Sequence, residues 1–176
     1  MAPRVIIASR SFGSASPKPL QLLEAAGVET AWVDANSPSA QDEILQLVPQ
    51  SSAIIVGLVP ITEKIIEHAP QLRVISMYGV GVNHIDLEAA RRKGVVVTNC
   101  PGSNDQAVAD LAMGLMLAAA RSIPLFDRDI RAGYWNKYLG GELWQKKLGL
   151  IGFGNIGKGV AHRAKGFAME ISAYDP

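Results

Sequence analysis

The stretch LGLIGFGNIGKG, residues 148–159, decides how the C-terminal part of this chain folds. A hydrophobic run suited to a buried parallel strand leads into it, and the residues that follow, through AHRAKGF, have a helical pattern. Gly152 permits a tight strand-to-helix corner, Gly154 lets a diphosphate approach the backbone, and Gly157 lets the helix pack on the sheet. The stretch therefore predicts a strand, a glycine-rich turn, and a helix whose N-terminus faces an anion.

An acidic residue completes this pattern. Asp175 ends the next hydrophobic stretch, MEISAYD, 18 residues beyond Gly157. This is close to the spacing at which a carboxylate accepts the ribose hydroxyls of a dinucleotide. The same carboxylate would repel a 2′-phosphate, so the sequence favours NAD over NADP. A glycine turn with an unrelated surface aspartate remains the alternative at this point.

Short β-branched runs alternate with helical patterns before this stretch, which predicts an α/β fold around a parallel sheet. Thr62 and Asp86 are the expected N-caps of two of the helices. Five strands with four crossovers would make a self-sufficient doubly wound domain over residues 1–99, and residues 100–176 would form a second part. Strands are expected at residues 4–9, 29–34, 53–57, 73–78 and 94–99, and helices at 17–27, 39–50, 62–70 and 86–94.

Composition excludes several classes of function. The chain has 176 residues and a net charge of +1, which offers no basic face for nucleic acid. Its single cysteine, Cys100, excludes an intramolecular disulfide and any CxxC metal motif, and we expect it to be a small buried residue. No metal site is expected. The longest apolar segment, residues 107–120, is shorter than the roughly 20 residues that span a bilayer, and the N-terminus lacks a secretory signal. We expect a cytoplasmic protein.

The segment between the predicted first domain and the glycine-rich stretch has a different composition. Residues 106–121, QAVADLAMGLMLAAAR, predict a helix that is apolar on nearly every face, which we expect to be buried between two domains or two subunits. Met113 and Met116 are expected to fill packing gaps there. Residues 122–147 hold two of the three Trp and two of the four Tyr. They predict an irregular arm on a short helix, and its aromatics indicate a subunit contact.

Two segments carry a family resemblance: YGVGVNHIDLEAARRKGVVVTNCPGSNDQAVADLAMGLMLAAAR (78–121) and LGLIGFGNIGKGVAHRAKGFAMEISAYDP (148–176). Together they resemble the D-isomer-specific 2-hydroxyacid dehydrogenases, which include phosphoglycerate, glyoxylate/hydroxypyruvate and D-lactate dehydrogenases. The resemblance implies a flavodoxin-like substrate domain over residues 1–99. Residues 100–176 would be a linking helix, a dimerisation arm and the first βαβ unit of a Rossmann domain. It further implies NAD as cofactor, a small 2-hydroxy or 2-oxo acid as substrate, hydride transfer at C2, and a homodimer.

The resemblance also implies roles for individual residues. Backbone N–H groups of Val80 and Gly81 would hold the substrate carboxylate, because a glycine-flanked loop after a parallel strand can form an anion nest. The positions implied to contact the cofactor are Gly152, Gly154, Asn155, Ile156, Gly157, Asp175, Val80, Asn104 and Val108.

Other features depart from the family. Its catalytic Arg, acidic residue and His lie beyond the segment present here, so we assign no catalytic residue and expect the chain alone to be inactive. His68, His84 and His162 are expected to be structural or solvent-facing. The stretch VGLVP (56–60) and Met77 lack cations that phosphoglycerate members tend to carry, which favours a non-phosphorylated acid without excluding phosphoglycerate.

The last strand expected, EISAYD, would leave an open sheet edge. A truncated parent enzyme, a natural short product and a fragment completed by a partner chain all remain open. The alternative function is a non-enzymatic binding or regulatory module that acts through its substrate domain or its arm.

Overall fold

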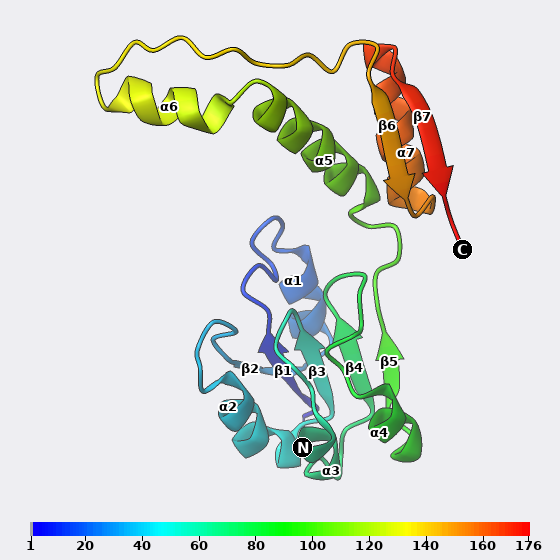
Figure 1. Cartoon of the computed structure of the whole chain (residues 1–176). Helices are drawn as coiled ribbons and strands as arrows, with labels where there is room; N and C mark the ends of the chain where they lie inside the picture. Colours follow the sequence, from blue (N-terminus) through cyan, green and yellow to red (C-terminus); the bar gives the residue numbers. More distant parts are fainter. Residues whose placement is uncertain (1) are drawn as a thin grey trace. The chain divides into compact units, whose positions relative to one another are not determined.

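The computed structural model describes residues 2–176, which divide into two compact units, one ending at Ser103 and the other spanning Asn104–Pro176. The first unit is an α/β fold built on a parallel sheet, as predicted (Figure 1). Each expected strand and helix is present, with ends that differ by a few residues. Its elements are β1 Arg4–Ala8, α1 Lys18–Ala25, β2 Glu29–Trp32, α2 Ala40–Leu47, η1 Val48–Gln50, β3 Ala53–Val56, α3 Glu63–Glu67, β4 Val74–Met77, α4 Leu87–Arg92 and β5 Val96–Thr98.

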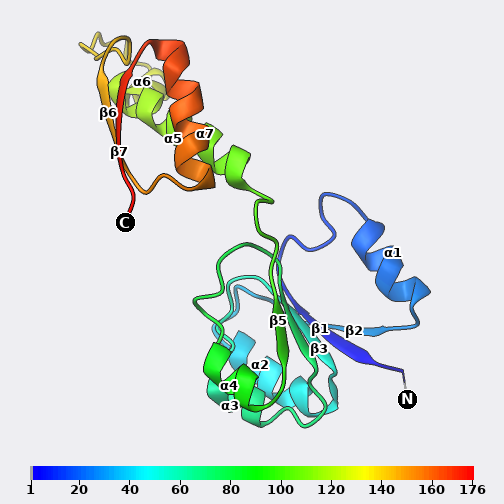
Figure 2. The same ribbon diagram turned by 90° about the vertical axis from the view of Figure 1, so that its right-hand side faces the viewer.

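The five strands lie in the order β2-β1-β3-β4-β5, and every pair is parallel. Ile6 lies opposite Ile54, and Ile54 lies opposite Ile75, so one fully buried row of isoleucines crosses the three central strands. Helices α2, α3 and α4 cover this face, and α1 lies on the other face (Figure 2). Because all strands run the same way, the loops that follow them gather at one edge, where parallel sheets bind ligands.

Local chemistry explains the helix ends. Oδ1 of Asp86 accepts a hydrogen bond of 2.8 Å from the N–H of Ala89, which confirms its predicted role as the N-cap of α4. Gly94 ends that helix with φ at +68°, a conformation that favours glycine. Thr62 occupies the N-cap position of α3, but its side chain makes no capping hydrogen bond.

The second unit packs two helices against a two-stranded sheet. Ala109 and Met113 of α5 are buried against Val160 and Ala164 of α7, which confirms the packing role predicted for Met113. The guanidinium of Arg163 ties the two helices together. The elements of the second unit are α5 Asp105–Ala120, α6 Ile123–Arg131, β6 Lys147–Ile151, α7 Asn155–Ala164, η2 Lys165–Phe167 and β7 Glu170–Tyr174. The partners of Arg163 are Asp110 at 2.6 Å, Gln106 at 3.1 Å and the carbonyl of Gly159 at 3.0 Å.

Helix α5 is buried on one face only within this unit, since Leu111 and Leu115 are exposed. After α6 the chain runs without regular structure through residues 134–143, as predicted, and this segment is the arm (Figure 1). Among the described residues no single helix is long and apolar enough to cross a membrane. Helices α5 and α6 together reach the length and composition, but a bend of 65° separates them.

Candidate functional site

The glycine-rich turn connects β6 to α7, as the sequence predicts. Gly152 adopts φ of +94°, a left-handed conformation that side chains rarely tolerate. A Cβ added to Gly157 would lie 2.4 Å from the carbonyl oxygen of Gly152. The first turn of α7 therefore packs directly on the backbone of the corner, and only glycine permits this approach.

Helix α7 begins at this corner with no side-chain hydrogen bond to its N-terminus. Gly154 is the N-cap, and it offers no side-chain oxygen to the first-turn N–H groups. The N–H groups at the start of an α-helix have no intrahelical partners, and the helix dipole gives that end a partial positive charge. Asn155 and Ile156 thus contribute free backbone donors where an anion would bind.

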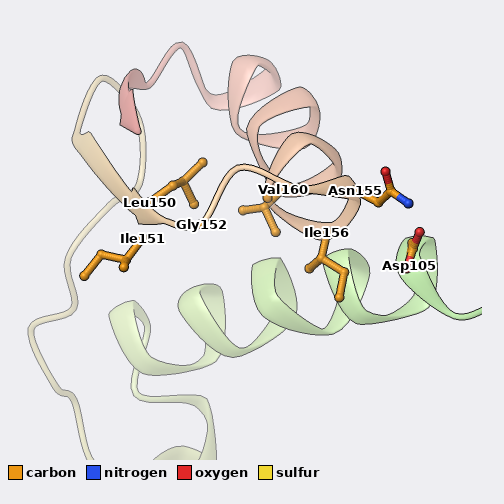
Figure 3. A pocket seen from close by; sticks show the side chains of 9 residues that line it. Asp105, Leu150, Ile151, Gly152, Asn155, Ile156 and Val160 are labelled. Carbon is orange, nitrogen blue, oxygen red and sulfur yellow. The ribbon is translucent and has the colours of Figure 1, made fainter. Parts of the chain in front are cut away.

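A cavity of about 490 Å³ opens at this helix end (Figure 3). Its floor is apolar, formed in part by Leu150 and Val160, and its rim carries the backbone donors of the turn. Asp105, at the start of α5, also lines it, although the sequence pattern did not single this residue out. Only the packing of α5 on α7 brings it there. The lining residues are Asp105, Leu150, Ile151, Gly152, Gly154, Asn155, Ile156, Gly157 and Val160.

Asp175 lies beside the same turn. Its Oδ2 accepts a hydrogen bond of 3.0 Å from the N–H of Phe153, and the preceding carbonyl, of Tyr174, accepts one of 2.7 Å from the N–H of Gly152. The exposed carboxylate at the end of β7 is therefore held against the corner by the backbone of the corner itself. This is the arrangement that the spacing of Asp175 from the glycines predicts.

Asn104 and Val108 are not among the residues that line this cavity. Asn104 is the N-cap of α5, where its carbonyl accepts a hydrogen bond of 2.9 Å from the N–H of Val108. The observed role of this pair is to begin the helix. Their predicted place near the nicotinamide stays a prediction.

The loop after β4 belongs to the first unit and contains Val80 and Gly81. The carbonyl of Gly79 accepts a hydrogen bond of 2.8 Å from the N–H of Cys100, and the carbonyl of Val80 accepts one of 2.7 Å from Nδ2 of Asn99. Among residues 2–176, the N–H groups of Val80 and Gly81 have no recorded hydrogen-bond partner. With its carbonyls engaged and these amides free, the loop can accept a carboxylate.

Cys100 is exposed, so the expectation of a buried cysteine is wrong. The reason is its position: it follows the edge strand β5, which no further strand of this sheet covers. Its thiol lies 3.7 Å from the carbonyl of Met77.

The histidines have distinct surroundings. Nδ1 of His68 lies 2.8 Å from the carbonyl of Lys64, within its own helix end. Nε2 of His84 is buried without a hydrogen-bond partner among the described residues. Within the described part of the chain no group of three His, Cys, Asp or Glu side chains is placed to hold a metal ion.

A buried carboxylate fastens the arm to α6. Asp129 is 6% exposed, and it accepts hydrogen bonds from the hydroxyl of Tyr138 and, at 2.9 Å, from Nδ2 of Asn136. The hydrogen bond from Tyr138 is the main cause that lowers the pKa of Asp129, and the same bond raises the pKa of Tyr138. The ring of Tyr138 also meets Phe126 edge to face at 5.2 Å. No sequence pattern had pointed to this cluster.

Comparison with known proteins gives consistent matches. The family model described as "D-isomer specific 2-hydroxyacid dehydrogenase, catalytic domain" matches residues 5–173. The chain is 42% identical over 151 residues to D-3-phosphoglycerate dehydrogenase of Methanocaldococcus jannaschii, covering 84% of this chain and 29% of that protein. It is 45% identical over 139 residues to hydroxypyruvate reductase of Thermotoga maritima, covering 77% of this chain and 45% of that protein.

Among solved structures, NAD+-bound 3-phosphoglycerate dehydrogenase of Entamoeba histolytica superposes with a TM-score of 0.81 at 28% identity. That match covers 100% of this chain and 55% of the other. The chain thus spans about half the length, or less, of the relatives it matches.

Proposed function

Because the chain belongs to the D-isomer specific 2-hydroxyacid dehydrogenase family, we propose that it provides the carboxylate-binding loop and the diphosphate-binding turn of an NAD-dependent 2-hydroxyacid dehydrogenase. The observation that carries this proposal is the start of α7, whose N-cap Gly154 supplies no side-chain hydrogen bond, with the carboxylate of Asp175 held at the same corner. The substrate would be a small 2-hydroxy or 2-oxo acid.

The residues present fit NAD. Glycines at 152, 154 and 157 place no side chain at three positions of the corner, and a Cβ at Gly154 would meet no atom within 4 Å, so the approach to the helix end at Gly154 is open. The first-turn amides of α7 would hold the diphosphate, and Asp175 would accept the hydroxyls of the adenosine ribose. When bound, NAD supplies the hydride acceptor for oxidation at the substrate C2.

The chain's own residues would orient the substrate. The free amides of Val80 and Gly81 would hold its carboxylate, which leaves C2 and its oxygen outside the loop. We assign no general acid or base among residues 2–176. His68 contacts the carbonyl of Lys64 at its own helix end, Nε2 of His84 is buried, and His162 lies in the last turn of α7, away from the start of that helix. The 176-residue chain by itself is therefore proposed to bind NAD and the small acid but not to catalyse hydride transfer between them.

Two measurements test this proposal. In 15N-HSQC titrations of the chain, NAD should shift the amides of Gly152–Gly157, and D-glycerate should shift those of Val80 and Gly81. NADH oxidation with hydroxypyruvate, glyoxylate or pyruvate should stay at background. Unmoved Gly152–Gly157 amides at millimolar NAD would refute the dinucleotide site, and turnover by the chain would refute the assignment of no catalytic residue.

The arm favours a second role, association with another copy of the chain. Trp135 is 85% exposed and Leu139 fully so, whereas Asn136 and Tyr138 face α6 through Asp129. A segment that is fixed on one side and apolar on the other is typical of a subunit contact. A homodimer is accordingly proposed, and a regulatory partner that binds the same arm is the alternative.

A further inference from the structure

We propose that Arg10 selects substrates that carry a second negative charge, either a phosphate or a second carboxylate, beside the carboxylate held by Val80 and Gly81. This inference rests on the proposed function, since it assumes that the loop after β4 binds a carboxylate. It assigns a specificity role to a loop that no sequence motif had marked, residues 9–14 after β1.

The loop after β1 is held by turns of its own backbone. Turns within it place the N–H of Phe12 3.4 Å from the carbonyl of Ser9, and the N–H of Ser14 3.1 Å from the carbonyl of Ser11. Ser9 is buried, and a Cβ on Gly57 would lie 3.3 Å from its Oγ. Ser9, the first residue of the loop, therefore packs closely on Gly57 after β3, and a larger residue at position 57 would require Ser9 to shift.

The same loop reaches the carboxylate-binding loop. Strand β3 lies between β1 and β4, so their ends are about 10 Å apart by the spacing of strands. Side chains bridge this distance: the rings of Phe12 and Tyr78 meet edge to face at 5.5 Å, and the hydroxyl of Tyr78 lies 3.5 Å from the carbonyl of Ser11. Tyr78 directly precedes the Gly79–Gly81 loop, so the two loops form one surface.

Charge on this surface comes from Arg10. It is the only lysine or arginine in the loops that follow β1, β3, β4 and β5. Its side chain is exposed, and among the described residues it forms no ion pair or side-chain hydrogen bond. Arginine binds phosphate and carboxylate groups through paired, charge-assisted hydrogen bonds. An unpaired guanidinium in a loop that contacts Tyr78, the residue before the carboxylate-binding loop, thus suits a small acid with two anionic ends.

The position of Arg10 bears on the expectation, made from the sequence, that the substrate is a non-phosphorylated acid. That expectation rested on the missing cations at residues 56–60 and at Met77, at the ends of β3 and β4. The loop after β1 contacts Tyr78, which follows β4, so a cation that follows a different strand lies at the same edge of the sheet.

The test titrates the 176-residue chain with D-3-phosphoglycerate, D-malate, D-glycerate and inorganic phosphate at low ionic strength, with 15N-HSQC as readout. We expect the three organic acids to shift Val80 and Gly81. Phosphoglycerate and malate should bind about two- to five-fold more tightly than glycerate, the range that one exposed charge pair provides. Inorganic phosphate alone should bind more weakly than phosphoglycerate.

Variants assign the effect to one side chain. Arg10→Ala should bring the three organic acids to equal affinity, and Arg10→Lys should keep part of the preference. The matched control is Arg73→Ala, since Arg73 is also exposed without a side-chain partner but precedes β4 at the opposite edge of the sheet. It should leave the preference unchanged.

The possible failures are distinguishable. If D-glycerate shifts the loop but Arg10→Ala leaves the preference intact, or the wild-type chain shows no preference, the role of Arg10 is wrong while the proposed function stands. If glycerate moves neither Val80 nor Gly81, the carboxylate-binding loop is wrong, and the inference fails with it.

Discussion

The N–H of Phe153 and the carboxylate of Asp175 are joined by a hydrogen bond of 3.0 Å, although 22 residues separate them in the chain. This bond fixes the acidic end of β7 beside the start of α7. It places a carboxylate next to a helix end that attracts negative charge. A ligand there must therefore offer hydroxyl donors to the carboxylate of Asp175 and an anion to the N-terminal amides of α7. A ribose joined to a diphosphate meets both demands.

Replacing Asp175 tests this arrangement. Asp175→Ala should weaken NAD binding about tenfold, because a hydrogen bond to a charged group is lost. Asp175→Asn should reduce the preference for NAD over NADP, because the charge that repels a 2′-phosphate is gone. Both can be measured from amide shifts of Gly152–Gly157. Glu170→Gln is the matched control, since Glu170 is an exposed carboxylate at the other end of β7, and a similar loss there would contradict the prediction.

Gly157→Ala should destabilise the second unit. The new Cβ would meet the carbonyl oxygen of Gly152 at 2.4 Å, and since that atom is backbone the corner itself must shift. Overpacking of this kind costs about 1–3 kcal/mol. Hydrogen exchange of the α7 amides measures the loss within this unit. Gly166→Ala is the control, because a Cβ there meets nothing within 4 Å, and equal effects of the two substitutions would disprove the close-packing argument.

Attachment of the arm should depend on pH at both extremes. The pKa of Asp129 is lowered in the folded chain, mainly by the hydrogen bond from Tyr138, so its contribution is complete above the unfolded value of about 3.9 and is lost as pH falls through the folded pKa. The pKa of Tyr138 is raised by the same bond, so its contribution is complete below about 10 and is lost as pH rises through the folded pKa. Tryptophan fluorescence against pH would show both limbs, and Asp129→Asn should flatten the acid limb.

Tyr138→Phe should release the arm at neutral pH. It removes the hydroxyl that donates to Asp129 but keeps the ring that packs on Phe126. Trypsin should then cut after Lys137 several-fold faster than in the wild-type chain. Tyr134→Phe serves as the comparison, since the side chain of Tyr134 is exposed and its hydroxyl has no recorded partner in the described chain. Unchanged cleavage in Tyr138→Phe would show that the hydrogen bond does not hold the arm.

The proposed dimer should depend on the exposed side of the arm. Trp135→Ser combined with Leu139→Ser should shift sedimentation from dimer toward monomer, because both side chains offer apolar surface to a partner. Leu58→Ser removes a similarly exposed leucine from the first unit and should have no effect. A wild-type chain that sediments as a monomer at high micromolar concentration would refute the proposed dimer.

Patterns that lie within a few residues of each other were readable from the sequence. The strands of the first unit, the capping by Asp86 and the corner at Gly152 were predictable because β-branched runs, cap residues and glycine act on the backbone locally. Even the hydrogen bond from the corner to Asp175 could be anticipated. In a strand–turn–helix–strand unit of ordinary length, the second strand ends beside the turn that follows the first strand, and Asp175 lies at that end.

Only the tertiary structure decided the rest. The contact between Ser11 and Tyr78 joins residues that are 67 positions apart. Asp105 lines the cavity only because α5 packs on α7. Asp129 is buried only because the arm folds back on α6. The exposure of Cys100 follows from β5 being an edge strand. These features depend on which elements become neighbours, and that is set by the packing of whole faces, which no short stretch of sequence encodes.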